Sequence, residues 1–257
     1  MRRFLFLAFS LQIFAAPVAA QFVAPGGAIP AVANITGKHG ELWKSDVSIR
    51  NVGTAETSVT LLLLPEITAE GAAFEPQVSD PVIIPGNGQV TLVNVVSTVF
   101  GLSQSKGGLQ VFSNDGGSVA LGSRTYTDAE GGGTYGLNVY GLLIVNNEAW
   151  IANVQNDGFF RTNVGIYLPI NPPSGESYVF TIVVTDNQGQ EVSSGSVIFD
   201  EGGLIQKELE YFGVTDPLFD GSITIRSNAQ DVPWYAYATI IDNSTNDSVF
   251  RAAMGQQ

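Results

Sequence analysis

Apolar and polar residues alternate along several short segments of the chain. The alternation is clear in residues 57–61, 89–93 and 178–184, and the last of these segments is rich in β-branched and aromatic residues. A period of two in segments of this composition predicts half-buried β-strands. Clusters of Gly, Pro, Asn and Asp separate them, as at 85–88 and 114–117, and predict tight turns. We therefore expect an all-β chain.

An internal repeat divides the sequence. Residues 43–49 (WKSDVSI) align with 160–166 (FRTNVGI), and 108–113 align with 221–227. Upstream, the tetrapeptide at 32–35 (VANI) matches the one that begins at Ile151 (IANV). Several matches in the same order predict two copies of one unit of about 115 residues, which is a normal domain size.

The expected domains follow from this repeat. We assign residues 22–146 to the first copy and 147–257 to the second, each with about seven or eight strands. This strand number predicts two tandem immunoglobulin-like or jelly-roll-like β-sandwich repeats. A short helical turn is expected before each Phe-Gly pair, at 95–100 and 207–212.

The N-terminal segment predicts secretion. Met1-Arg2-Arg3 precedes an apolar stretch that ends in Val18-Ala19-Ala20, the pattern of a signal peptide over residues 1–20. An uncleaved anchor is the alternative interpretation. The chain contains no Cys, which excludes disulfides and thiolate chemistry. We expect a secreted, periplasmic or cell-surface protein without a transmembrane segment in its mature chain.

Charge narrows the range of partners. The chain carries 24 acidic and 11 basic residues, for a net charge of −13. Such a field repels phosphate backbones, so we expect no nucleic-acid partner. It is compatible with divalent cations, and calcium is the cofactor that the sequence leaves open.

Short sequence motifs carry a family resemblance. Residues 29–33 (IPAVA), 43–46 (WKSD) and 237–247 (YATIIDNSTND) resemble a poorly characterised group of tandem β-sandwich repeat segments in secreted proteins of environmental bacteria. In that group the segments stand alone or are appended to extracellular enzymes. The resemblance implies the tandem sandwich fold and implies no particular activity.

Catalytic chemistry has few candidates. His39 is the only histidine, and no Gly-x-Ser-x-Gly motif accompanies it, so we interpret it as a loop residue rather than a catalytic base. The Gly-rich stretch at 131–136 precedes a strand-like segment, which favours a hairpin tip over a dinucleotide site. Carboxylate pairs remain open, as a glycosidase would need, and the candidates are Asp200, Glu201, Glu208 and Glu210.

An oxygen-rich loop is the candidate metal site. Asp242, Asn243, Asn246 and Asp247 could supply calcium ligands, although the run lacks the EF-hand pattern. The alternative, which we favour, is a turn closed by hydrogen bonds from Asx side chains.

Aromatic residues give the best indication of binding. Strand geometry places Trp234 on one face and Tyr235 with Tyr237 on the other, so one face predicts an exposed platform for sugar rings or a partner. Trp43, Phe159 and Phe160 lie at the equivalent position of the two copies, where the chain enters a strand. This recurrence favours packing in the core rather than a role in binding.

Lys44 and Arg161 occupy the same position in the two copies of the repeat. We expect each of these cations to bind an acidic side chain of its own copy.

The sequence thus predicts a non-catalytic binding or structural protein, adhesive or carbohydrate-binding. A glycan or a cell-surface protein is the expected partner. The alternative is a polysaccharide-acting hydrolase with a carboxylate pair.

Overall fold

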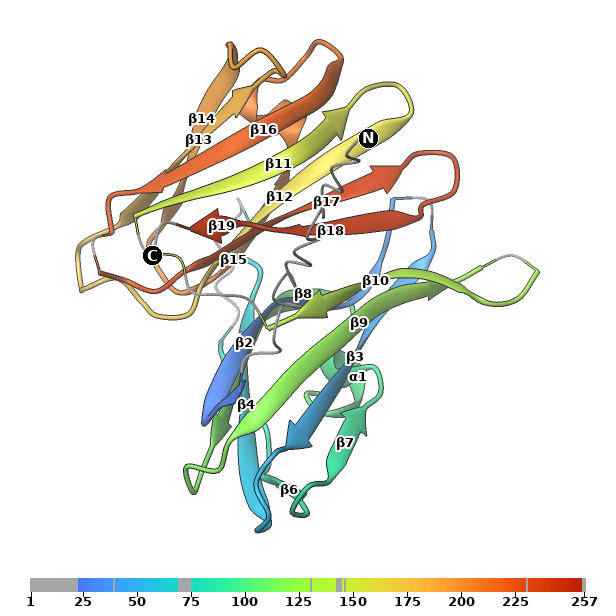
Figure 1. Ribbon diagram of the computed structural model, residues 1–257, viewed down its shortest axis with the longest axis vertical. Helices are drawn as coiled ribbons and strands as arrows, with labels where there is room; N and C mark the ends of the chain where they lie inside the picture. Colours follow the sequence, from blue (N-terminus) through green and yellow to red (C-terminus); the bar gives the residue numbers. More distant parts are fainter. Residues whose placement is uncertain are drawn as a thin grey trace, which may run out of the picture.

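The computed structural model describes residues 23–38, 40–68, 75–129, 131–141, 145, 147–229 and 231–255. The predicted signal peptide at 1–20 and His39 lie outside the described residues. Within these ranges the chain is nearly all β-strand, as predicted, with sheets packed as sandwiches. Figure 1 shows two lobes, with the N-terminal half of the chain in the lower lobe and the C-terminal half in the upper one.

The first half comprises two layers around one apolar core. One layer contains β4, β8 and β2 in that order, and the other contains β7, β3, β9 and β10; the pairing of β2 with β3 joins them into one continuous sheet. The described elements are β1 (Val23–Ala24), β2 (Gly26–Thr36), β3 (Leu42–Asn51), β4 (Thr57–Pro65), β5 (Gln77–Val78), β6 (Val82–Ile84), β7 (Gln89–Leu92), α1 (Val95–Thr98), β8 (Ser105–Ser113), β9 (Val119–Asp128) and β10 (Thr134–Tyr140).

The second half also has two layers around an apolar core, here as two separate sheets. Its layers are β13, β16 and β11, with β14 on the outer edge, and β15, β12, β17 and β18. The described elements are β11 (Glu148–Asn156), β12 (Phe160–Leu168), β13 (Tyr178–Thr185), β14 (Glu191–Phe199), β15 (Gly203–Glu208), η1 (Leu209–Phe212), β16 (Leu218–Ser227), β17 (Tyr235–Asp242), β18 (Ser248–Ala252) and β19 (Met254–Gly255).

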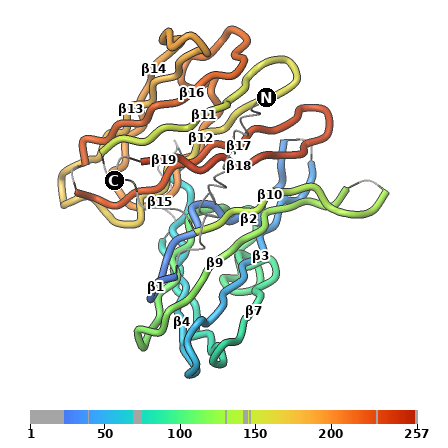
Figure 2. Tube along the Cα trace, viewed as in Figure 1, coloured from blue at the N-terminus to red at the C-terminus, as the bar shows by residue number. Residues whose placement is uncertain are grey.

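Several strand pairings recur in the two halves, although in the described part of the chain the pairing of β2 with β3 has no counterpart between β11 and β12. β3 lies between β7 and β9 as β12 lies between β15 and β17, and β8 joins β2 to β4 as β16 joins β11 to β13. The helical turns expected before Phe100 and at Phe212 are present as α1 and the 3₁₀ helix η1. In Figure 2 the trace runs from blue to green through the lower lobe and from yellow-green to red through the upper lobe.

One part of the sequence alignment is displaced by three residues. The strand ladders place Val32 opposite Gly107 and Val154 opposite Gly221, in each case just after a β-bulge. Val32 of β2 therefore corresponds to Val154 of β11 and not to Ile151. Because the bulge changes the local side-chain period, the tetrapeptide match was wrong in its register although it fell on the right strand.

The two halves pack against each other through one sheet face. The outer face of β12 and β17 presents Tyr167, Tyr235 and Tyr237, which are buried together with Ala28 and Leu64 of the first half. Hydrogen bonds add to this contact: Gln110 Nε2 donates to the Pro169 carbonyl at 2.7 Å, and the Ile67 amide donates to the Leu204 carbonyl at 2.7 Å. No helix in the described part of the chain is long and apolar enough to span a membrane.

Candidate functional site

A cavity of about 280 Å³ lies between the two halves. β2, β3, β9 and β10 of the first half form one side, and the outer face of β12, β17 and β18 forms the other. A volume of this size is near the lower end of small-molecule sites. The cavity is lined by Ala31, Ile35, Thr36, Gly37, Lys38, Glu41, Trp43, Lys106, Thr125, Leu137, Val139, Arg161, Asn163, Gln206, Glu208, Tyr237, Thr239, Ile241, Ser248 and Phe250.

Strand register aligns the polar side chains of the second half into one patch. Asn163 lies opposite Thr239, and Arg161 and Ser248 both lie opposite Ile241. Adjacent strands are about 5 Å apart, and successive side chains on one face are about 7 Å apart, so the patch is roughly 10–15 Å across.

Four buried polar atoms of this patch have no hydrogen-bond partner among the described residues. They are Asn163 Oδ1, Tyr237 OH, Thr239 Oγ1 and Ser248 Oγ. Tyr237 is 1% exposed, Thr239 8% and Ser248 9%. Buried polar atoms are nearly always paired in folded proteins, and leaving one unpaired costs about 1–3 kcal/mol. Because four of these atoms lie in one cavity wall, we take that wall as the candidate site.

Tyr237 is fixed in this wall by close packing. Its ring lies over Gly165 of β12, where a Cβ atom would come within 2.1 Å of the tyrosine Cζ, and it stacks on Phe250 with ring centroids 5.1 Å apart. Burial raises the pKa of Tyr237 well above its ordinary value. The phenol is therefore neutral at physiological pH and can both donate and accept a hydrogen bond.

Charged groups surround the patch. Lys38 Nζ lies 3.8 Å from Glu208 Oε1, and Lys106 Nζ lies 2.9 Å from Glu66 Oε1. Arg161 Nη1 instead donates to the neutral Asn243 Oδ1 at 2.6 Å. The two lysines are thus balanced by carboxylates, whereas the observed partner of Arg161 is an amide.

Trp43 supplies an aromatic side chain to the wall from the first half. Its indole Nε1–H donates a hydrogen bond to Glu41 Oε1 at 2.9 Å. Because this satisfies the polar group of the indole, the rest of the ring adds apolar surface to the wall. The expected core packing of this repeat position was wrong, because Trp43 is only half-buried and Phe159 is 78% exposed. Both residues lie where a strand begins, outside the region in which the two layers face each other.

The predicted aromatic platform is corrected by the burial of its three residues. Trp234 is 0% exposed and packs edge-on against Phe180 in the core of the second half, with ring centroids 5.1 Å apart. Tyr235 and Tyr237 do lie on the opposite face, but the first half covers that face. The sequence analysis assumed that the face away from the core meets solvent, whereas here it meets another domain-sized unit.

The predicted calcium loop is a hydrogen-bonded turn in the structure. Asp242 Oδ1 accepts hydrogen bonds from the Ser244 amide at 2.7 Å and the Ser244 hydroxyl at 2.5 Å, and from the Thr245 amide at 3.1 Å. These bonds, that of the Ser244 hydroxyl first, lower the pKa of Asp242. Asn243 Oδ1 accepts from Arg161, and Asp247 Oδ1 accepts from the Ser248 amide. No group of three or more His, Cys, Asp or Glu residues suited to a metal ion occurs among the described residues.

The candidate carboxylates are dispersed. Glu208 lines the cavity, whereas Glu210 accepts a hydrogen bond from Asn156 Nδ2 at 3.0 Å and Asp200 accepts one from Ser177. Glu41 also lines the cavity and was not predicted. The structure therefore brings one predicted acid together with one that sequence reasoning missed.

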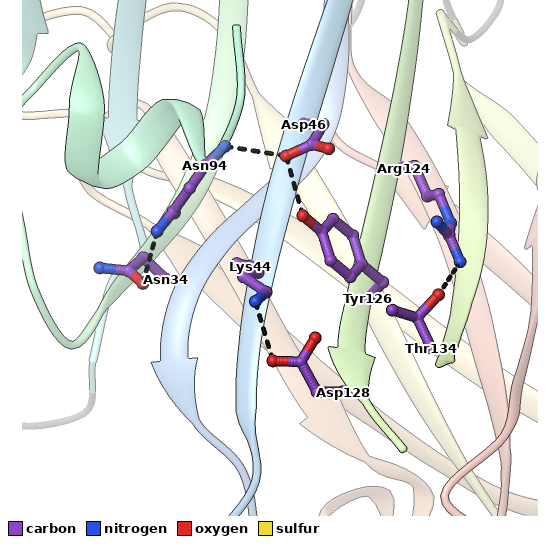
Figure 3. A network of polar contacts seen from close by, with 8 residues as sticks. All are labelled: Asn34, Lys44, Asp46, Asn94, Arg124, Tyr126, Asp128 and Thr134. Atoms are coloured by element: carbon purple, nitrogen blue, oxygen red, sulfur yellow. Dashed lines mark hydrogen bonds and ion pairs between the residues drawn. The ribbon is translucent and has the colours of Figure 1, made fainter. Parts of the chain in front are cut away.

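A second polar cluster covers the solvent-facing side of β3 and β9 (Figure 3). Lys44 Nζ donates to Asp128 Oδ2 at 3.0 Å, as expected for this position, and lies 5.2 Å from the ring centroid of Tyr126. Asp46 Oδ1 accepts from the Asn94 amide at 2.8 Å and from Tyr126 OH at 3.3 Å. Arg124 stacks on the same ring at 4.9 Å. Cations and carboxylates balance in this cluster, so it presents no excess charge.

Comparisons with known proteins show no family for this chain. No family model matches it, and no curated protein matches it. Among solved structures, a lectin from Pleurotus ostreatus in complex with GalNAc is 12% identical at a TM-score of 0.22, with 91% of this chain and 88% of that chain covered. So low a TM-score carries no argument about function.

Two glycosidases give similarly weak matches. A glycosyl hydrolase family 2 member from Bacteroides cellulosilyticus is 7% identical at a TM-score of 0.18, with 89% of this chain covered. The β-glucuronidase of Ruminococcus gnavus is 11% identical at a TM-score of 0.18, with 90% of this chain covered. This chain spans 27% and 34% of the length of these two proteins.

Proposed function

We propose that this chain is a non-catalytic, secreted or cell-surface protein that binds carbohydrate in the cavity between its two halves. The observation that carries the proposal is the set of unpartnered polar atoms on Asn163, Tyr237, Thr239 and Ser248. Sugars offer hydroxyl groups that both donate and accept hydrogen bonds. They also offer C–H faces that pack on apolar and aromatic surface, which Trp43 and Phe250 provide.

We further propose that the two halves are copies of one sandwich unit of the immunoglobulin-like or jelly-roll type. The matching neighbours of β3 and β12, those of β8 and β16, and the aligned segments 43–49 and 160–166 support this. In the first copy the outer face of β3 and β9 carries a charged network, and in the second the corresponding face of β12 and β17 forms the cavity wall. Binding is thus a property of the tandem arrangement.

Secretion and the choice of partner remain part of the proposal. The basic start and small-residue end of segment 1–20 support export. We expect a glycan, free or on a cell-surface protein, and no nucleic acid, because the net charge is −13. Calcium is not required in this proposal, since the loop oxygens of Asp242 already accept hydrogen bonds.

Binding of the purified chain to a glycan array tests the proposal, followed by calorimetry on the best oligosaccharide with and without calcium. We expect binding that is independent of calcium and is weakened by Thr239→Val and Tyr237→Phe. Ser123→Ala is the matched control, because Ser123 Oγ is also buried and unpartnered but does not line the cavity. Loss of binding in the control alone would point to another site.

Glu41 and Glu208 favour a second candidate function. Both carboxylates line the cavity, and two acids across a sugar are the minimum for glycoside hydrolysis. Release of reducing ends from a panel of polysaccharides, measured for the natural chain and for the E41Q/E208Q double variant, separates the two functions. Turnover that disappears in the double variant would establish a hydrolase and overturn the non-catalytic proposal.

A further inference from the structure

The positions of Lys44 and Asp128 have counterparts in the second half. Lys44 lies opposite Tyr126 in the β3–β9 ladder, and Arg161 lies opposite Ile241 in the β12–β17 ladder. Asp128 follows Tyr126 by two residues, as Asn243 follows Ile241. The ion pair Lys44–Asp128 at 3.0 Å therefore corresponds to the contact Arg161–Asn243 at 2.6 Å, in which the carboxylate has become a neutral amide.

A second acid is exchanged in the same way. Asp46, two residues after Lys44, corresponds to Asn163, two residues after Arg161. Asp46 is occupied by hydrogen bonds from Asn94 and Tyr126 in the network of Figure 3, whereas Asn163 Oδ1 is unpartnered. At these positions the solvent-facing side of β3 and β9 has both carboxylates, and the cavity-facing side of β12 and β17 has neither.

The exchange leaves one positive charge on the cavity wall without an acidic partner. Lys38 and Lys106 have Glu208 and Glu66 as partners, but no salt bridge within the described ranges includes Arg161. A half-buried guanidinium has five N–H donors in a planar fork that matches a carboxylate. This charge is present in a chain whose net charge of −13 repels anions elsewhere.

We infer that the sugar bound in this cavity carries a carboxylate, as a uronic acid does. The carboxylate binds the guanidinium of Arg161, and the ring hydroxyls bind Asn163, Thr239 and Ser248. This inference rests on the proposed carbohydrate-binding function and adds the substrate class to it. A single guanidinium balances a single negative charge, while Glu41 and Glu208 in the same lining disfavour a more highly charged group such as a phosphate.

Calorimetry on the full chain tests this substrate class. The probes are trisaccharides of galacturonic and glucuronic acid, the neutral galactose and glucose trisaccharides of the same linkages, and a sulfated neutral trisaccharide. We expect at least one uronic-acid probe to bind about tenfold more tightly than its neutral counterpart and to lose affinity as NaCl is added. Arg161→Gln should remove that preference, and Arg161→Lys should retain part of it.

Asn243→Asp is the most specific variant. It restores in the second half the acid that the first half has at Asp128, and the new carboxylate competes with the ligand for Arg161. We expect it to abolish the preference for the acidic probe while the melting temperature is unchanged or higher. Lys44→Gln, which alters the corresponding cation on the solvent-facing sheet, should leave binding unchanged.

The outcomes separate the inference from the proposed function. Equal affinity for acidic and neutral trisaccharides, or tighter binding of the sulfated probe, overturns the carboxylate inference and leaves carbohydrate binding intact. An acidic preference that persists in folded Arg161→Gln also overturns it. Failure of every probe to bind the natural chain overturns the proposed function itself.

Discussion

Gly108 of β8 lies directly against the ring of Tyr167 of β12, across the boundary between the two halves. A Cβ atom at Gly108 would come within 2.1 Å of Tyr167 Cε2. Tyr167 is fully buried there and stacks on Tyr235 with ring centroids 5.8 Å apart. This close approach fixes the orientation of β12, and therefore of the cavity wall that β12 helps to form.

Gly108→Ala is expected to destabilise the chain by about 1–3 kcal/mol, because the added methyl group overpacks the boundary. It should also weaken sugar binding by displacing β12. Urea denaturation and calorimetry measure the two effects. Gly158→Ala is the control, since a Cβ there meets nothing within 4 Å. Unchanged stability in Gly108→Ala would contradict the packing described for the two halves.

Thr239→Val is expected to separate stability from binding. The substitution removes a buried hydroxyl that has no partner in the described part of the chain, so the free energy of unfolding should stay constant or rise by about 1–2 kcal/mol. Binding should fall about tenfold, because the hydroxyl then no longer bonds the ligand. Ser123→Ala should have the same effect on stability and none on binding. A marked loss of stability in Thr239→Val would mean that the hydroxyl serves the fold.

Asp115 should make the stability of the first half depend on pH. Hydrogen bonds from the Thr57 hydroxyl first, then the Gly117 amide and the Ser113 hydroxyl, hold the pKa of Asp115 well below 3.8. A carboxyl group whose pKa is lower in the folded than in the unfolded state stabilises the fold at pH values above its unfolded pKa. This stabilisation is lost as the pH falls through the folded pKa. Asp115→Asn should therefore lower the melting temperature at neutral pH, and its difference from the natural chain should shrink progressively below pH 3.8.

Asp216→Asn is the control for the loss of one negative charge, because Asp216 is an exposed carboxylate in the other half of the chain. It should change the melting temperature little at any pH. A difference for Asp115→Asn that is constant from neutral to acidic pH would mean that its hydrogen bonds do not depend on ionisation.

Calcium is expected to leave the chain unaffected. The melting temperature should be the same in excess calcium and in EDTA, because Asp242 Oδ1 is satisfied by Ser244 and Thr245. Asp242→Ala should lower the melting temperature through loss of the turn between β17 and β18. Calorimetric titration with calcium chloride gives the direct measurement, and a calcium-dependent rise in melting temperature that Asp242→Ala removes would restore the metal-site interpretation.

Much of the fold followed from sequence because it depends on local pattern. Period-two alternation located β4, β7 and β13, and the match of residues 43–49 with 160–166 placed β3 and β12 at equivalent positions. The three-residue displacement in β2 and β11 escaped detection because a bulge leaves no distinct residue signature. Packing between the halves depends on contacts distant in sequence, such as Gly108 with Tyr167, which no local pattern specifies.

The candidate site was largely beyond the sequence analysis for the same reason. Tyr237 was identified, but as part of an exposed platform rather than a buried wall. Asn163, Thr239 and Ser248 look like ordinary strand residues until register places them together. One signal was available: Lys44, Asp46 and Asp128 align with Arg161, Asn163 and Asn243, so two positions that are acidic in the first half are neutral amides in the second.

The most direct test of binding between the halves is an NMR titration of the ¹⁵N-labelled chain with the oligosaccharide that binds best. The indole N–H signals of the three tryptophans, Trp43, Trp150 and Trp234, report on separate regions of the molecule. We expect the signals of Trp43 and of the Asn163 and Thr239 amides to shift along one saturable curve, while the Trp150 indole is unaffected. Shifts confined to Tyr126 and Arg124 on the solvent-facing sheet would contradict the assignment of the cavity as the binding site.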